Sequence, residues 1–280
     1  MPVQPMYTQY WQLKERPFEL TPDPRYVYYS KQIEEALMKL IYTVQDLKGA
    51  MLLTGLYGCG KTVLSRVFLT ELVGTRFEVA LITNPRLTAN ELLMEIIYQL
   101  GGGLLKGENK GQLLRVFNEM LYANLTRGKE TVLVIDEAQS IDDLETFEEL
   151  RMLLNYQQND RFLLTLILIG QSELRKRLKE LPQLKQRLII DYHLNPLDEQ
   201  DTQRYLDHRL KVAGAQGEIF DAGAKRFIYR SCGGIPRVIN GICDLALLEG
   251  YIQQKKIVDE ALVKKVVKDS NLDPVVWSGV

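Results

Sequence analysis

The stretch Gly55-Leu56-Tyr57-Gly58-Cys59-Gly60-Lys61-Thr62 decides the fold of this 280-residue chain. It fits the pattern G-x-x-x-x-G-K-S/T, in which glycines let backbone N–H groups turn inward around phosphate oxygens. The lysine of such a loop reaches the β- and γ-phosphates, and the hydroxyl group after it holds magnesium. The stretch therefore predicts a phosphate-binding loop for ATP and Mg²⁺, with Lys61 and Thr62 in these two roles.

The flanking sequence supports this prediction. An apolar run at 50–54 reads as a buried strand, and an amphipathic segment at 61–72 reads as a helix. A helix that begins at the loop adds positive potential to the phosphate site. The alternative, a tight turn without a ligand, does not account for the strand, the loop and the helix together.

Two acids follow a second apolar run, Val132-Leu133-Val134-Ile135-Asp136-Glu137. A carboxylate at a strand end can reach Mg²⁺, so Asp136 is predicted on the metal side. The adjacent Glu137 is a candidate general base that polarises the attacking water. A helix cap or a loop acid is the alternative for each residue.

Polar residues also end two other predicted strands. Gln171 follows the run 163–169 and could hold the attacking water, or it could cap a helix or serve as a loop amide. Asn84 follows the run 79–83 and could hold Glu137 away from the water, although Asn before Pro is often only turn chemistry.

Two arginines are candidates for stabilising charge during phosphoryl transfer. Arg187 precedes the last predicted strand, and Arg237 opens a later helix. A guanidinium delivered across a domain or subunit boundary stabilises the charge of the reacting phosphate. On sequence chemistry alone, each could equally be a surface arginine on a charged helix.

Apolar runs of strand length alternate with amphipathic segments through the first two thirds of the chain. This pattern predicts an α/β fold in which a parallel five-stranded sheet is covered by helices in three layers. The expected strands are 50–54, 79–83, 131–136, 163–169 and 189–194. The expected helices of this part are 31–47, 61–72, 89–100, 111–127, 144–157 and 172–181.

After Asn195-Pro196 only helical periodicity remains, which predicts a small all-helical domain. Its expected helices are 199–212, 221–231, 236–254 and 259–268. The predicted organisation is an N-terminal arm and helix packed on the core (1–48), an ATPase core (49–195), a helical domain (196–270) and a C-terminal tail (271–280).

Composition excludes several classes of protein. With 46% hydrophobic and 25% charged residues, the chain is neither disordered nor a disulfide scaffold. A formal net charge of −1 gives no global attraction to nucleic acid or acidic membranes. The N-terminus lacks the apolar core of a signal peptide, and the three cysteines show no CxxC spacing. These features predict a cytoplasmic protein with reduced thiols.

Taken in order, these motifs resemble the AAA+ ATPases, and more specifically their ExeA/GspA (general secretion pathway protein A) family. The resemblance runs from about Tyr10 to Gly250. It rests on the stretches YWQLKERPFELTPDPRYVYYS, VLVIDEAQ, TFEELRMLLNY, IGQSEL, LKQRLIIDYHLNPL and SCGGIPRVINGICDLAL. It implies a P-loop ATPase whose helical domain acts as a lid, and an ATP hydrolase that works as a homo-oligomer, in a ring or filament.

The resemblance also implies roles for individual residues. Asp136 and Glu137 correspond to Walker B, Gln171 to sensor 1, Arg187 to an arginine finger acting on a neighbouring subunit, and Arg237 to sensor 2. Adenine is expected between the arm around Tyr28 and the lid near Pro236. The residues expected to contact the nucleotide are Gly55, Tyr57, Gly58, Cys59, Gly60, Lys61, Thr62, Val63, Tyr28, Pro236 and Arg237.

The resemblance indicates the partner of this protein less directly than it indicates the nucleotide site. Family members that serve secretion continue into membrane and wall-binding parts, whereas this sequence stops at Val280. Short members are similar to MuB/TniB-type transposition ATPases, which implies a nucleotide-dependent switch on double-stranded DNA that recruits or activates a transposase-like partner. The alternative is an ATPase for secretion or for pilus or envelope assembly that works with a membrane protein.

One local charge excess bears on this choice. The segment 172–187 has six basic and two acidic residues, a net +4 in a near-neutral chain. It could meet DNA phosphates, meet an acidic neighbour in a ring, or form a solvated helix surface.

Overall fold

The computed structural model describes residues 6–103, 107, 109–158 and 161–270. They form two compact units. One unit contains residues 31–57 and 64–194, and the other contains residues 6–30, 58–63 and 195–270. The predicted tail at 271–280 lies outside the described residues.

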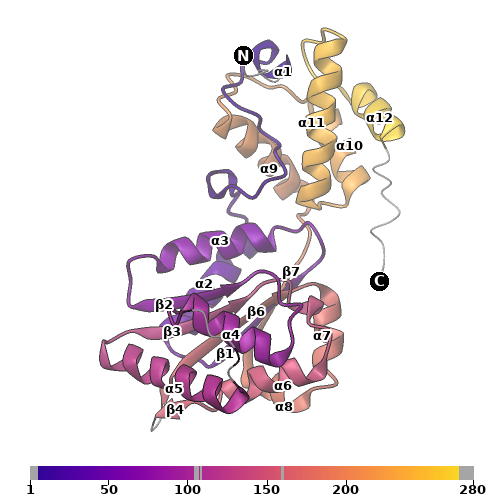
Figure 1. Cartoon of the computed structure of the whole chain (residues 1–280). Coiled ribbons are helices and arrows are strands. Elements are labelled where there is room, and N and C mark those ends of the chain that lie inside the picture. Colours follow the sequence, from indigo (N-terminus) through magenta and orange to yellow (C-terminus); the bar gives the residue numbers. More distant parts are fainter. Residues whose placement is uncertain (1–5, 104–106, 108, 159–160, 271–280) are drawn as a thin grey trace. The chain divides into compact units, whose positions relative to one another are not determined.

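The first unit is built around a parallel five-stranded sheet with helices on both faces (Figure 1). The strand order is β2-β3-β6-β1-β7, so β6 separates β1 from β3. This confirms the predicted fold class and all five predicted strands. Their bounds are β1 Ala50–Gly55, β2 Phe77–Ile82, β3 Glu130–Ile135, β6 Leu164–Gly170 and β7 Leu188–Leu194.

The three central strands are buried along their whole length, which explains their uniform apolar sequences. Alternate side chains point to opposite faces. Leu52 and Leu133 belong to a cluster with residues of α4, α5 and α6. Met51 lies on the other face, where the Thr43 hydroxyl of α2 approaches its sulfur at 3.3 Å. Both faces of the sheet are therefore covered.

The helices of this part begin where the sequence offers caps. Thr88 with Glu91, and Asn109 with Gln112, form reciprocal capping boxes at the starts of α4 and α5. The bounds are α2 Lys31–Gln45, α3 Lys61–Leu72, α4 Ala89–Gln99, α5 Lys110–Thr126, η2 Ala138–Ser140, α6 Leu144–Leu153, α7 Ser172–Leu178 and α8 Pro182–Arg187.

Two predicted helix ends are wrong. The helix expected over 144–157 ends at Leu153, and a short antiparallel pair follows, β4 Gln157–Gln158 with β5 Arg161–Phe162. The helix expected over 172–181 ends at Leu178, and Pro182 then begins α8. Proline lacks an N–H but fits the first turn of a helix. Pro182 therefore starts α8, in addition to ending the segment before it.

The second unit is mainly helical, which confirms the helical C-terminal part. Its elements are α1 Met6–Tyr10, η1 Pro24–Tyr26, α9 Glu199–Val212, α10 Ala222–Cys232, α11 Pro236–Ile252 and α12 Glu260–Asp269. Gly233, at φ +57°, caps α10, and Pro236 is the first residue of α11. Backbone conformation and the missing proline N–H place the break between these two helices.

The prediction that residues 1–48 form one segment packed on the ATPase core is corrected by the structure. Residues 6–30 share a hydrophobic cluster with α9 to α12, whereas the helix from Lys31 packs on the sheet. The Trp11 indole Nε1 donates to the Leu247 carbonyl at 2.9 Å, and the Tyr7 hydroxyl hydrogen-bonds Asp244. Aromatic rings of the arm fill the apolar stripe of α11 while their polar ends find partners.

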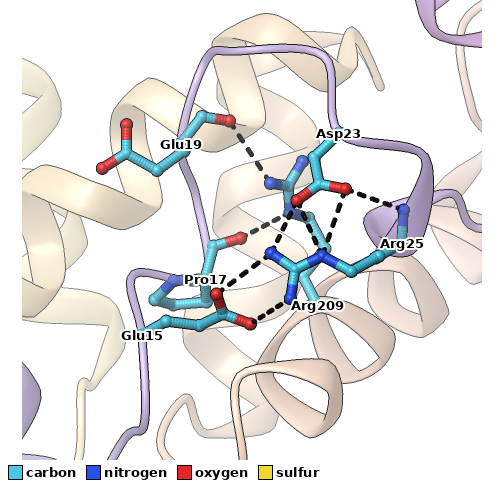
Figure 2. Close-up of polar contacts among 6 residues, drawn as sticks. All are labelled: Glu15, Pro17, Glu19, Asp23, Arg25 and Arg209. Atoms are coloured by element: carbon cyan, nitrogen blue, oxygen red, sulfur yellow. Dashed lines mark hydrogen bonds and ion pairs between the residues drawn. The ribbon is translucent and has the colours of Figure 1, made fainter.

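A buried arginine fixes the arm to α9 (Figure 2). Arg209 is 6% exposed, and its guanidinium donates to the Pro17 carbonyl at 2.5 Å and the Glu19 carbonyl at 3.3 Å. Farther along, Arg25 pairs with both Glu15 and Asp23. These groups border a polar cavity of about 590 Å³. The contacts tie residues 15–25 to one helix.

In the part of the chain that the structure describes, no helix is both long and apolar enough to cross a membrane.

Candidate nucleotide site

The carboxyl ends of the parallel strands gather the predicted residues of the first unit. β1 ends at Gly55, β3 is followed by Asp136, and β6 is followed by Gln171. Asn84 comes two residues after β2. Because these four strands are neighbours and run parallel, the residues lie along one edge of the sheet. This edge is the usual ligand position in open α/β sheets.

Gly55 is required at the end of β1 by close packing. A Cβ on this residue would lie 2.6 Å from the Leu194 carbonyl oxygen of the neighbouring strand β7. The loop then continues along the chain through Leu56 and the exposed Tyr57. The first glycine of the motif therefore lets β1 pair with β7 up to the point where the loop departs.

Two later glycines adopt backbone conformations that other residues resist. Gly58 has φ +82° and Gly60 has φ +95°. Left-handed conformations cost an L-residue roughly 1–2 kcal/mol. A Cβ on Gly58 would lie 2.8 Å from the Arg237 Cβ and 3.1 Å from the Ile235 Cγ2, whereas one on Gly60 would meet nothing within 4 Å. At Gly60, the backbone conformation alone explains why the residue is glycine. At Gly58, the close approach of Arg237 is a second reason.

Lys61 and Thr62 are the first two residues of α3. Lys61 is 5% exposed, and Thr62 is exposed. Backbone N–H groups in the first turn of a helix have no intrahelical acceptor, so an anion can take these bonds. Cys59 is buried at 4% exposure, which suits a small filler below the loop, and Val63 is half-buried.

Asp136 and Glu137 lie in contrasting environments. Asp136 is 5% exposed, and its Oδ1 accepts the Glu137 N–H at 2.8 Å. Glu137 is half-buried with φ +53° and ψ 35°, a left-handed conformation that is uncommon for residues other than glycine. Residues in such regions concentrate at functional sites, where surrounding contacts over-determine them.

Gln139 is a residue of this site that the sequence reasoning passed over. Its Nε2 donates to the Glu137 Oε2, and its Oε1 accepts the Gln171 backbone N–H at 2.9 Å. One amide therefore joins the predicted base to the end of β6. The position of Gln139, three residues after Asp136, was the signal in the sequence that could have identified it as a site residue. Its bond to Gln171 could not be foreseen, because that bond depends on the strand order.

Gln171 and Asn84 are placed differently from each other. Gln171 occupies the N-cap position of α7, but its side chain makes no cap hydrogen bond, so capping does not explain this amide. Asn84 is exposed, and among the described residues its amide makes no hydrogen bond to Glu137. The contact with Glu137 that we expected from Asn84 is made by Gln139.

Arg187 is the last residue of α8 and directly precedes β7, as the sequence predicts. It is half-buried, and its guanidinium donates to the Asn155 Oδ1 at 2.8 Å. A neutral amide leaves the positive charge of Arg187 uncompensated by that contact. The remaining donors of the guanidinium suit a second, anionic partner.

Arg237 meets the loop through its backbone. Its N–H donates to the Gly58 carbonyl at 3.2 Å, and its side chain is exposed. The neighbouring Pro236 opens α11 and is half-buried. The Tyr28 hydroxyl donates to Asp201 at 2.9 Å, and burial together with this bond raises the pKa of Tyr28. Tyr28 is thus held against α9 by its polar end.

The arginines of the basic segment 172–187 are largely engaged within the chain. Arg175 pairs with Asp191 at 2.6 Å. Arg177 donates to the backbone carbonyls of residues 139, 141 and 142, and its guanidinium lies 5.4 Å from the centre of the Phe147 ring. The exposed basic side chains that remain in this segment are Lys176, Lys179 and Lys185. The local charge excess is therefore smaller at the surface than in the sequence.

The donor set fits Mg²⁺ and a nucleotide phosphate. Thr62 supplies a hydroxyl and Asp136 a carboxylate, and hard oxygen ligands of this kind are those that Mg²⁺ uses beside substrate phosphates. The two positive-φ glycines and the helix start at Lys61 supply backbone N–H groups for an anion. By residue type, these groups suit a magnesium ion and a phosphate group.

Comparison with known proteins agrees with this chemistry. A family model described as an AAA domain matches residues 44–178. General secretion pathway protein A of Aeromonas hydrophila is 42% identical over 248 residues, which are 88% of this chain and 45% of that protein. The chain therefore spans a little under half the length of this relative.

Solved structures of similar fold include ORC and Cdc6 proteins. ORC2 of Aeropyrum pernix, in ADPNP and ADP complexes, has a TM-score of 0.67 at 18% identity, covering 91% of this chain and 72% of that one. Cdc6p of Pyrobaculum aerophilum has a TM-score of 0.70 at 17% identity, covering 89% and 71%. Drosophila ORC bound to DNA has a TM-score of 0.69 at 18% identity, covering 95% and 66%.

At such identities these structures bear on the fold alone. The AAA domain at residues 44–178 and the 42% identity together support an AAA+ ATPase of the ExeA/GspA family.

Proposed function

We propose that this chain binds and hydrolyses ATP with Mg²⁺ and uses the nucleotide state to control a partner. Lys61 and the loop N–H groups bind the phosphates, and Thr62 with Asp136 holds the metal. Magnesium, when bound, neutralises charge on the β- and γ-phosphates. Glu137 acts as the general base, and Gln171 orients the attacking water.

Arg187 completes the site of a neighbouring subunit in this proposal, so that activity requires a homo-oligomer. The support is its position beside β7 and a contact partner, Asn155, that carries no charge. A guanidinium that must reach another subunit's nucleotide benefits from being oriented without being neutralised. Ring and filament arrangements both satisfy this requirement.

The observation that carries the proposal is the bond between the Arg237 N–H and the Gly58 carbonyl. It joins the phosphate loop to the first turn of α11 through main-chain atoms. A nucleotide that rearranges the loop would therefore shift the start of α11, while the exposed Arg237 side chain remains able to sense the phosphate. This coupling is what a nucleotide-dependent switch needs.

For the partner we propose a membrane protein of a secretion or envelope-assembly system. The support is the 42% identity with a protein named for the general secretion pathway. The switch on double-stranded DNA with a transposase-like partner, which the resemblance to short family members led us to expect first, loses support because Arg175 and Arg177 are engaged within the chain. The ORC and Cdc6 structures contribute only their fold to this question.

The first test is steady-state ATP hydrolysis by the purified chain with magnesium and with EDTA. Lys61→Ala should lose nucleotide binding, because its charge and the loop share the phosphates. Glu137→Gln should bind ATP and accumulate an assembled state without turnover. Tight ATP binding by Lys61→Ala, or normal turnover by Glu137→Gln, would contradict the assigned roles.

Double-stranded DNA, added at two salt concentrations, tests the partner class. We expect hydrolysis to be indifferent to DNA. DNA stimulation that weakens with salt would instead favour the DNA switch, because phosphate contacts release counterions. Lys176→Gln combined with Lys179→Gln is the matched control, since these lysines are the exposed cations on α7 and the turn after it.

A further inference from the structure

The segment after β3 holds Glu137 in an unusual backbone conformation. Glu137 has φ +53°, and the short helix η2 Ala138–Ser140 follows it directly. A left-handed residue turns the chain sharply, so that the side chain at 139 comes back toward the one at 137. Such a conformation costs a non-glycine residue free energy, and nearby contacts must hold it in place.

Gln139 supplies one such contact at each end of its side-chain amide. Nε2 donates to the Glu137 Oε2, and Oε1 accepts the backbone N–H of Gln171 at 2.9 Å. An amide has both donor and acceptor groups, so it can bridge a carboxylate and an N–H at once. The orientation of this amide is fixed by both partners together.

The backbone that carries Gln139 is itself anchored. The Arg177 guanidinium donates to the carbonyls of residues 139 and 142, at 3.0 and 2.9 Å, and to the Ile141 carbonyl. On the other side, a Cβ added to Gly170 would lie 2.8 Å from the Gln139 Oε1. The Gln139 amide therefore occupies a site with little freedom, between the end of β6 and the segment that α7 holds.

We propose that Gln139 is a positioning residue for Glu137 and sets the orientation of its carboxylate for catalysis. The inference rests on the proposed function, in which Glu137 is the general base. In that step a water oxygen bonds to the γ-phosphorus, the water proton passes to Glu137, and the bond from that phosphorus to the leaving ADP oxygen breaks. Because Gln139 holds Oε2, Oε1 is left to accept the proton.

The bridge also links this base to Gln171. Movement of the β6 end is transmitted through the Gln171 N–H to the Gln139 amide, and from there to Glu137. Gln139 therefore contacts Glu137 where we expected Asn84 to do so, but in this proposal it orients the carboxylate for catalysis and does not hold it away from the water.

Two substitutions separate the two hydrogen bonds. Gln139→Met keeps the length of the side chain but loses both bonds. Gln139→Glu keeps an acceptor for the Gln171 N–H but replaces the donor with a carboxylate that repels Glu137. If positioning of Glu137 is the role, Gln139→Glu is the slower enzyme; if the bond to Gln171 is what matters, Gln139→Met is slower.

We expect kcat to fall roughly 10- to 100-fold in Gln139→Met and further in Gln139→Glu, since small misplacement of a catalytic group costs about this much. The Kd of a fluorescent ATP analogue should change less than about twofold. Gln183→Met and Gln183→Glu are matched controls on the exposed surface of α8 and should behave as wild type. Circular dichroism verifies folding of each variant.

The decisive readout is a double-mutant cycle with Glu137→Gln, followed by single-turnover hydrolysis of radiolabelled ATP. If Gln139 acts through Glu137, adding Gln139→Met to Glu137→Gln changes the residual rate by less than about twofold. An undiminished loss in that background overturns the assignment, as does a wild-type kcat in Gln139→Met. A folded wild-type protein that binds ATP and never hydrolyses it overturns the proposed function itself, and the role of Gln139 with it.

Discussion

The backbone N–H of Arg237 lies 3.2 Å from the carbonyl oxygen of Gly58 and donates a hydrogen bond to it. A phosphate loop and the first turn of a helix from the C-terminal part of the chain are therefore joined by main-chain atoms. Side-chain substitution cannot remove such a bond directly. Displacing the backbone can, and Gly58 offers the position for doing so.

Gly58→Ala should impair both stability and nucleotide binding. The new Cβ would lie 2.8 Å from the Arg237 Cβ, and φ is +82°. We expect a loss of about 2–4 kcal/mol in the free energy of unfolding, from backbone strain and overpacking together. Gly60→Ala carries the φ strain without the close neighbour and should lose about 1–2 kcal/mol. Urea unfolding compares the two, and equal losses would show that the approach to Arg237 is unimportant.

Arg187→Ala should leave ATP binding by each subunit intact and abolish turnover, because its guanidinium serves the nucleotide of a neighbour. Mixing it with Lys61→Ala, which has an intact Arg187 but a disabled loop, should restore part of the activity. Asn155→Ala, which removes only the neutral partner of Arg187, should reduce turnover less. A mixture with no recovered hydrolysis would argue against action between subunits.

Arg209→Met should loosen the N-terminal arm. The substitution keeps the apolar stem but leaves the Pro17 and Glu19 carbonyls without this donor. We expect a loss of about 2–4 kcal/mol in the free energy of unfolding, because buried partners lose a charged hydrogen bond. Protease cleavage within residues 15–25 should become faster. Arg204→Met, an exposed position on the same helix, should stay within about 0.5 kcal/mol of wild type.

Stability should fall as the pH drops below about 6.5, the usual pKa of histidine. Burial, followed by the positive charge of Arg209, lowers the pKa of His208 in the folded chain. The unfolded chain therefore takes up the proton first, so stability declines until the folded-state pKa is passed. His208→Gln should flatten this part of a pH series of urea midpoints. An unchanged slope would assign the pH dependence to other groups.

The sequence by itself determined the five strands and the phosphate loop, because both are local. Strands buried on both faces need uninterrupted apolar runs such as Val132 to Ile135, and a phosphate loop needs glycines at fixed spacing before a lysine. The positions of Asp136 and Gln171 directly after β3 and β6, with Glu137 next to Asp136, could be predicted for the same reason. The AAA domain match supports the reading of these motifs.

Only the tertiary structure decided which residues meet across sequence distance. The strand order places the end of β6 beside that of β3, which lets the Gln171 N–H reach Gln139. The arm of residues 6–30 packs on α9 and α11 because Arg209 and Leu247 offer partners to its polar groups. Neither contact has a local signal: hydrogen bonds between segments depend on how distant backbones approach, and periodicity and motif spacing do not carry that information.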